Sequence, residues 1–277
     1  MKFKKGFTIK PKAVNSVGEV LFTDGVNEVL ANQKVCEAYG YRYNPSKGTC
    51  EAFIYNTKLN RNASNVHNIT KGTNNTTNAG TENTFVLGRD NTTFGDNKNS
   101  IVIGQNNQIE TEVNNAAVIT GSFGKALNQS ELVLSGGGFG DTVGLSQTSF
   151  VQQSGLTTDN TQTNLFTQYI TNKFIEKVAN AVIGFEANVI GVNYGGEGEV
   201  GQYIYLQLTG AVAIGNGFAT TYTQSSTIIA DGGLEASATM KDATATSFGV
   251  AVTGQEGIRI QWTADIRLWQ NKITTTF

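Results

Sequence analysis

Hydrophobic residues in the first half of the chain recur on a sixteen-residue register. The strings HNITKG, NTFVLG, NSIVIG and NAAVIT begin at positions 67, 83, 99 and 115. In the first three, a glycine ends the apolar stretch, and an asparagine follows at positions 75, 91 and 107. A short strand and a bend repeated at a fixed period predict the coils of a stacked β-solenoid, which builds a rod.

Apolar residues occupy both sides of each expected strand, because neighbouring residues of a strand point in opposite directions. A thin coil can fill only one interior. A second apolar face, formed by the middle positions such as Val102 or by their flanking pairs, therefore needs another surface to cover it. Two further copies of the chain are the economical cover, with a dimer as the lesser option. The residues expected in the repeat core or the trimer packing are Ile69, Phe85, Val86, Leu87, Ile101, Val102, Ile103, Val118, Ile119 and Val133.

The pattern divides the chain into four segments. We expect an N-terminal segment that docks to a larger assembly or caps the first coil, then a solenoid shaft, a polar connector and a C-terminal domain. Their ranges are 1–58, 59–145, 146–164 and 165–277. In the first segment, Val20–Phe22 and Phe53–Tyr55 are expected strands, and Gly25–Lys34 an expected helical turn.

Longer strands with turn signals between them are expected in the C-terminal segment. The last one alternates from Ile258 to Leu268, with apolar residues on one face and Arg259, Asp265 and Arg267 on the other. Six to eight antiparallel strands of this kind predict a β-sandwich or jelly roll. The segment 165–181 is compatible with a helix or with two strands, and its β-branched and aromatic residues favour strands.

Cys36 and Cys50 are the only cysteines, fourteen residues apart. They are compatible with a disulfide around an Asn-Pro-Ser turn, and equally with two free thiols in a chain assembled under reducing conditions. Two cysteines and one remote histidine do not make a metal site.

The composition argues against two classes of binding partner. The chain has 20 basic and 22 acidic residues and no cluster of either arginine or lysine, so neither nucleic acid nor an anionic membrane surface is an expected partner. It has 32 glycines and 2 prolines, which favours an all-β chain. No apolar run reaches the length of a signal peptide or a membrane span, so we expect a chain made in a cytoplasm and not inserted in a membrane.

The sequence offers little for catalysis, and no enzyme, cofactor or metal is expected. His67 shares its repeat slot with Asn83, Asn99 and Asn115, which indicates a turn position. A glycosidase would need two carboxylates, and Glu110 with Glu112 or Glu197 with Glu199 are the candidates. We expect both pairs to be solvated. The aromatic residues that could stack on sugars at strand ends are Tyr194, Tyr203, Tyr222 and Trp269.

The coils NTFVLG, NSIVIG and NAAVIT resemble the left-handed β-roll of trimeric autotransporter adhesin heads and the similar repeats of bacteriophage tail-fibre and spike proteins. About 75 residues are covered. The C-terminal strings AVIGFEANVIGV, LTGAVAIGNG and GIRIQWTADIRLW are similar to a β-domain that follows such repeats in phage fibres. An autotransporter would also have a coiled-coil stalk and a membrane-anchor barrel, which this sequence does not show, so the phage family is favoured.

The resemblance implies an intertwined homotrimeric fibre or spike, made in the host cytoplasm and carried on the virion surface. Its N-terminal segment would bind other virion proteins, and its C-terminal head would bind a glycan or protein of the host surface. One alternative is a purely structural capsid or tail decoration with a C-terminal trimerisation domain. Another is the passenger of a bacterial surface adhesin.

Overall fold

The computed structural model describes residues 9–15, 17–52, 67–135, 142–168 and 170–273, without the side chains of Thr120 and Ser135. The chain divides into two compact units, Met1–Asn60 and Arg61–Phe277. The regular elements of the described residues are all strands, apart from one six-residue helix. The all-β prediction is confirmed. No helix in these residues is long and apolar enough to cross a membrane.

The first unit holds a three-stranded antiparallel sheet, a two-stranded hairpin and the helix. The sheet consists of β1 (Lys10–Val14), β2 (Val20–Thr23) and β3 (Glu28–Val29), the hairpin of β4 (Arg42–Asn44) and β5 (Thr49–Glu51), and the helix is α1 (Gln33–Ala38). Asn32 caps α1 by accepting a hydrogen bond from the backbone N of Val35. The helix therefore begins near the end of the segment predicted for it, and the strand expected at 53–55 lies outside the described residues.

A disulfide joins Cys36 of α1 to Cys50 of β5. Both cysteines are buried, and they pack with Val20, Phe22 and Val35 in the core of this unit. The bridge connects the helix to the hairpin. The sequence is compatible with a disulfide or with two free thiols, and the structure contains the disulfide.

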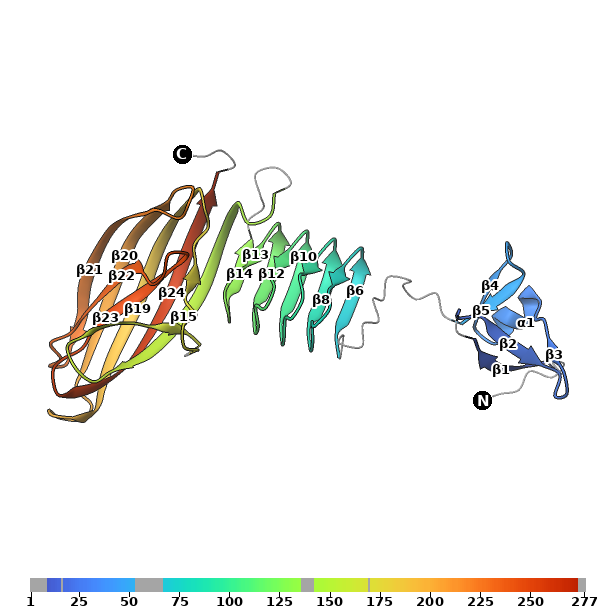
Figure 1. Cartoon of the computed structure of the whole chain (residues 1–277), viewed down its shortest axis with the longest axis horizontal. Helices are drawn as coiled ribbons and strands as arrows, with labels where there is room; N and C mark the ends of the chain where they lie inside the picture. Colours follow the sequence, from blue (N-terminus) through green and yellow to red (C-terminus); the bar gives the residue numbers. More distant parts are fainter. Residues whose placement is uncertain (1–8, 16, 53–66, 136–141, 169, 274–277) are drawn as a thin grey trace. The chain divides into compact units, whose positions relative to one another are not determined.

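The second unit begins with the solenoid, which stacks two parallel sheets (Figure 1). One sheet contains β6 (Ile69–Thr73), β8 (Phe85–Arg89), β10 (Ile101–Gln105), β12 (Ala117–Ser122) and β14 (Leu132–Ser135). The other contains β7 (Thr76–Thr77), β9 (Thr92–Thr93), β11 (Gln108–Ile109) and β13 (Lys125–Ala126). Ile69, Phe85, Ile101 and Ala117 pair in register, as the sixteen-residue period predicts. The last coil is one residue shorter, because Ala117 pairs with Leu132.

The middle positions of the repeat form the interior of the coils. Val86, Val102, Val118 and Val133 are all fully buried. Their flanking residues point to the other side of the sheet. The question that the sequence left open is thus decided: the flanking pairs make the second apolar face.

Asparagine side chains extend along one corner of the coils as a ladder. The side-chain oxygen of Asn75 accepts from the backbone N of Asn91, at 3.0 Å, and Asn91 does the same for Asn107, at 3.0 Å. At the other corner, His67 and Asn83 have positive φ angles of 63° and 51°. The turn role predicted for the His67 slot is confirmed.

Residues 146–164 are not a connector. They contain β15 (Ser146–Thr157), which pairs antiparallel with β14 on one side and along its whole length with β24 (Ile258–Lys272) on the other. The solenoid sheet therefore continues into the C-terminal strands. The result is an eleven-stranded sheet, ordered β21-β20-β19-β24-β15-β14-β12-β10-β8-β6 with β17 paired to β15. Its remaining strands are β17 (Phe166–Thr167), β19 (Ala181–Gly196), β20 (Tyr203–Ile214) and β21 (Thr220–Asp231).

A smaller sheet covers one face of the C-terminal strands. It contains β16 (Gln162–Asn164), β18 (Ile175–Glu176), β22 (Ser237–Asp242) and β23 (Ser247–Thr253). Phe248 and Val250 of β23 share one hydrophobic core with Phe185 of β19 and Trp262 of β24. The alternation predicted for the last strand is confirmed, because its residues from Ile258 to Leu268 are buried at every second position. We call the face of the large sheet opposite this core the open face.

Candidate functional site

The open face carries an apolar stripe along the solenoid. One row of residues in register crosses it from the first coil to the C-terminal strands: Ile69, Phe85, Ile101, Ala117, Leu132 and Phe150. A second row contains Leu87, Ile103 and Ile119, next to Lys71 at its end. Apart from Lys71 these rows hold no charge, so the stripe is a continuous apolar surface along the stack.

The stripe is exposed in the single chain. Ile69 is 51% exposed, Ile101 43% and Leu87 39%, whereas Val86 and Val102 on the opposite side of the same strands are fully buried. Apolar side chains in contact with water on one side of a fold are common singly, but contiguous apolar patches mark interaction sites.

At its C-terminal end the stripe meets an arginine held between two aromatic rings. The guanidinium of Arg267 lies 5.6 Å from the ring centroid of Phe150 and 4.8 Å from that of Trp269. Phe150 and Trp269 are each 37% exposed. Cation–π contacts of this kind hold a charged side chain over an apolar surface.

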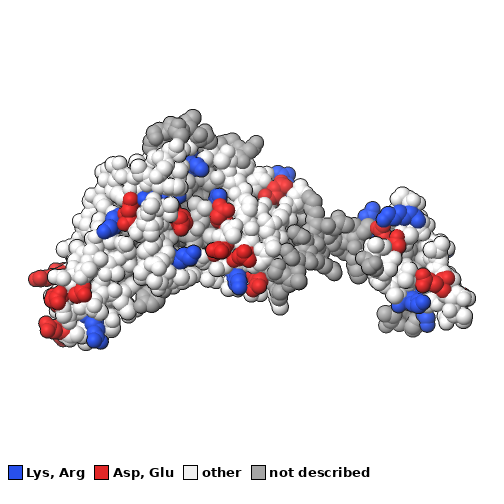
Figure 2. Space-filling view, in the orientation of Figure 1, with Lys and Arg blue, Asp and Glu red and all other residues white. Residues whose placement is uncertain are grey.

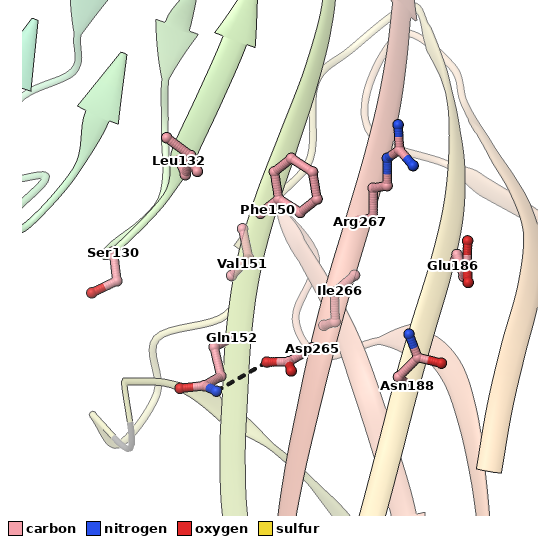
Figure 3. Close-up of a pocket in the computed structure, with 10 residues that line it drawn as sticks. All are labelled: Ser130, Leu132, Phe150, Val151, Gln152, Glu186, Asn188, Asp265, Ile266 and Arg267. Atoms are coloured by element: carbon pink, nitrogen blue, oxygen red, sulfur yellow. Dashed lines mark hydrogen bonds between the residues drawn. The ribbon is translucent and has the colours of Figure 1, made fainter. Parts of the chain in front are cut away.

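Beside Arg267 the open face is hollowed (Figure 3). The hollow has a volume of about 650 Å³, and β15, β24 and β19 form its floor. Its lining side chains are Ser130, Leu132, Phe150, Gln152, Glu186, Asn188, Asp265 and Arg267.

Polar side chains cross the floor of the hollow in hydrogen-bonded pairs. Gln152 donates to Asp265 at 2.9 Å, and Gln207 of β20 donates to Glu186 at 3.0 Å. In the described part of the chain, neither carboxylate nor Arg267 has an ion-pair partner. The hollow thus presents acidic and basic groups that are not neutralised by each other.

The four aromatic residues predicted as receptor contacts do not form one site. Tyr194 and Tyr203 lie on the open face near the β19–β20 hairpin and are 43% and 44% exposed. Trp269 lies on the same face but toward the other end of β24, opposite Gly184. Tyr222 lies on the core side of β21 and packs against the shared core.

Tyr222 belongs to a hydrogen-bonded cluster around Asp242. Its hydroxyl donates to Asp242 at 2.5 Å, and the ammonium of Lys177, whose side chain is 1% exposed, lies 2.9 Å from the same carboxylate. Lys177 also donates to the carbonyl oxygens of Phe218 and Ala245. Burial, followed by the bond to Asp242, raises the pKa of Tyr222. Partial burial raises the pKa of Asp242, but the hydrogen bonds from Tyr222 and Lys177 outweigh this effect, and the pKa is lowered. This cluster joins the two sheets and is satisfied within the chain.

The structure also shows where the two candidate pairs of glycosidase carboxylates lie. Strand β11 ends at Ile109, so Glu110 and Glu112 lie in the turn that follows it. Glu110 is paired with Lys125 at 2.5 Å. Both acids line a second hollow of about 340 Å³, together with Glu176, whose pKa is raised by burial. Glu197 and Glu199 lie in the β19–β20 hairpin. Among the described residues, no group of three or more His, Cys, Asp or Glu could hold a metal ion.

Arg267, Asp265 and Phe150 were not identified as site residues from the sequence. The alternation of the last strand did place Arg267 and Asp265 on the exposed face. Phe150 was missed because it lies in the segment that was interpreted as a connector.

No protein-family model matches the chain, and no curated protein sequence matches it. Two solved structures are similar to it in part. The tailspike protein of Acinetobacter baumannii phage AM24 has a TM-score of 0.26 and 8% identity, over 76% of this chain and 50% of the tailspike. The tailspike protein of Acinetobacter phage vB_ApiP_P1 has a TM-score of 0.21 and 9% identity, over 72% of this chain and 46% of the tailspike. The chain spans about half the length of these proteins. At such TM-scores the function has to be argued from the site itself.

Proposed function

We propose that the protein is a homotrimeric fibre or spike of a bacteriophage, carried on the virion surface, that attaches the virion to a glycan or protein of the host cell. The first unit binds other virion proteins, the solenoid is the shaft, and the C-terminal strands meet the host. The proposal involves no catalysis, no cofactor and no metal.

One observation carries the proposal: a rigid stack of coils with an apolar stripe along one side. The six residues of the first row lie on six successive strands of the large sheet, and strands in a sheet are about 4.8 Å apart, so the row is more than about 20 Å long. Burying apolar surface yields about 25 cal/mol per Å². Other copies of the same chain offer a matching stripe, because each copy has its apolar rows at the same spacing.

The charges of the second unit agree with a partner that is neither nucleic acid nor an anionic membrane. Figure 2 shows basic and acidic side chains interspersed over the visible face of the second unit, with no broad area of a single sign. Glu197 and Glu199 lie in the β19–β20 hairpin, near Tyr194 and Tyr203. Exposed aromatic side chains beside polar loops suit the stacking and hydrogen bonding of sugars. Three such ends in one trimer would raise the avidity for a weak ligand.

The solution mass tests the assembly. Light scattering of the intact protein should give three times the chain mass of 29.6 kDa. Ile101→Asp places a charge in the stripe and should reduce the mass to that of the monomer, while circular dichroism stays unchanged. Thr92→Asp, on the other solenoid sheet, is the control and should remain trimeric. A monomeric wild-type protein contradicts the proposal.

Attachment is tested with the trimer. Labelled protein should bind susceptible host cells and fail to bind resistant mutants that lack the receptor. Trimer that binds neither would favour the structural alternative, a capsid or tail decoration. Incubation with host capsule or lipopolysaccharide should release no reducing ends, and their release would make the protein a glycan-cleaving enzyme. A gene neighbourhood that encodes a membrane anchor in place of virion proteins would favour the bacterial adhesin.

A further inference from the structure

We infer that the hollow on the open face is the receptor for a side chain of the next copy: Arg267 of each copy pairs with Asp265 of its neighbour and closes a ring of three ion pairs around the trimer axis. This inference rests on the proposed function, since it requires the trimer. It adds the residues that fix the register of the copies.

The two charges stand where such a ring needs them. Asp265 and Arg267 both lie on β24, are both exposed, and are two residues apart on the open face. Two residues of a strand span about 6.8 Å. A threefold axis along the stack of strands keeps β24 of every copy at one height. Contacts around such an axis are head-to-tail, so a positive group on one side of the axis meets a different group of the neighbour.

Neither charge has an ion-pair partner in its own chain among the described residues. Glu186 is opposite Arg267 in the register of β19 and β24, yet the guanidinium lies over Phe150 and Trp269. In the described part of the chain, the carboxylate of Asp265 accepts one hydrogen bond, from Gln152. Its other oxygen remains available to a donor from outside, and a guanidinium can bind a carboxylate with two hydrogen bonds.

The surroundings of Arg267 are those of an interface anchor. Arginine and tryptophan are enriched at the residues that dominate binding between proteins, and such residues lie in patches from which water is excluded. The rings of Phe150 and Trp269 hold the guanidinium in place before binding, so little side-chain freedom is lost on assembly. The apolar stripe ends at Phe150, so the ring of charges lies directly next to the surface that the copies bury.

The hollow supplies the space. Asp265, Glu186 and Asn188 stand on its floor, as Figure 3 shows, and its volume of about 650 Å³ is sufficient for a side chain from a neighbouring copy. Glu186, which is opposite Arg267 in the strand register, adds a second negative charge to the floor of the hollow. An apolar stripe alone would allow the copies to slide along each other, whereas a charge pair at one height allows one register.

Charge reversal tests the ring. Arg267→Asp and Asp265→Arg each place like charges at three contacts, and each should raise the protein concentration at half assembly at least about tenfold in light scattering. The exchanged variant, with both substitutions in one chain, should restore assembly to the wild-type range. Arg259→Asp has the same change of charge on the same face of β24, six residues before Asp265, and should leave assembly unchanged. Added salt should reduce the difference between the single variants and the wild type.

The outcomes separate this inference from the proposed function. A wild-type monomer overturns both. A wild-type trimer that Arg267→Asp leaves intact overturns the ring alone, as does an exchanged variant that stays dissociated or an Arg259→Asp variant that dissociates equally. Circular dichroism identifies any variant that fails to fold, and the exchanged variant then decides, because it has the same composition as the wild type.

Discussion

Gly88 is a position at which one added methyl group should damage the shaft severely. Its φ angle is 126°, a conformation that residues with a side chain avoid, at a cost of about 1–3 kcal/mol. A Cβ atom there would also overlap the backbone carbonyl of Gly104 in the next coil. The same oxygen accepts a hydrogen bond from the side chain of Asn91 at 2.8 Å.

The overlap can be relieved only by separating β8 from β10 at the pair Gly88 and Gly104. This would cost about two hydrogen bonds, each worth about 1 kcal/mol. Together with the backbone cost, Gly88→Ala should lower the free energy of unfolding by about 4 kcal/mol. Folded domains have only about 5–15 kcal/mol in total, so the loss is large.

Gly217→Ala is the matched control. Gly217 also has a positive φ, of 84°, but no atom lies within 4 Å of its Cβ position. Its substitution should cost only the backbone term, about 1 kcal/mol. Urea unfolding gives both free energies, and hydrogen exchange should show faster exchange of the β8 and β10 amides in Gly88→Ala alone. Equal losses in the two variants would refute the packing argument.

Three further predictions concern other parts of the chain. Reduction of the Cys36–Cys50 bridge should destabilise the first unit by about 3 kcal/mol in thermal unfolding and leave the second unit unchanged. Asp242→Asn leaves the buried ammonium of Lys177 without its carboxylate and should cost about 3 kcal/mol in urea unfolding, against almost nothing for Asp159→Asn. Burial raises the pKa of Glu131, so the folded state holds this proton more tightly than the unfolded state does. The free energy of unfolding should therefore fall as the pH rises from about 4.3 through the raised pKa. Urea unfolding measured across this pH range should show the slope in the wild type and not in Glu131→Gln.

The stacking of the coils could be predicted from the sequence, because a repeat of exact length fixes the pairing of each residue with its counterpart one coil further. The side of the strand that faces the interior could not. Ile101 and Val102 are both apolar and adjacent, so the alternation fits equally well in either direction. The residues at the corners determine which side of the strand faces the interior. The fully buried Asn91 and Asn107 fill the interior next to the valines, and an asparagine ladder fits only on that side.

Strand β15 was missed for a different physical reason: its core side is polar. Gln147, Gln153 and Thr157 are buried there, and each bonds across to another element. Gln147 exchanges two hydrogen bonds with the backbone of Lys125, Gln153 accepts from the N of Val250, and Thr157 accepts from the indole N of Trp262. Buried polar residues that bond to partners distant in sequence cannot be distinguished from an exposed polar loop by composition. The same strand carries Phe150, so the site at Arg267 was lost with it.

The position of β15 also determines how assembly and fold depend on each other. It pairs with β14 of the solenoid and with β24 of the C-terminal strands, so the apolar stripe and the charged hollow lie on one continuous sheet. A neighbouring copy that covers the stripe up to Leu132 meets Phe150 on the next strand and Arg267 on the one after. Assembly through the shaft alone would leave the aromatic rings around Arg267 in water, and assembly through the C-terminal strands alone would leave the row from Ile69 to Leu132 in water. Because one sheet carries both surfaces, a single interface buries them together in the proposed trimer, and the proposed ion pairs set its register at β24.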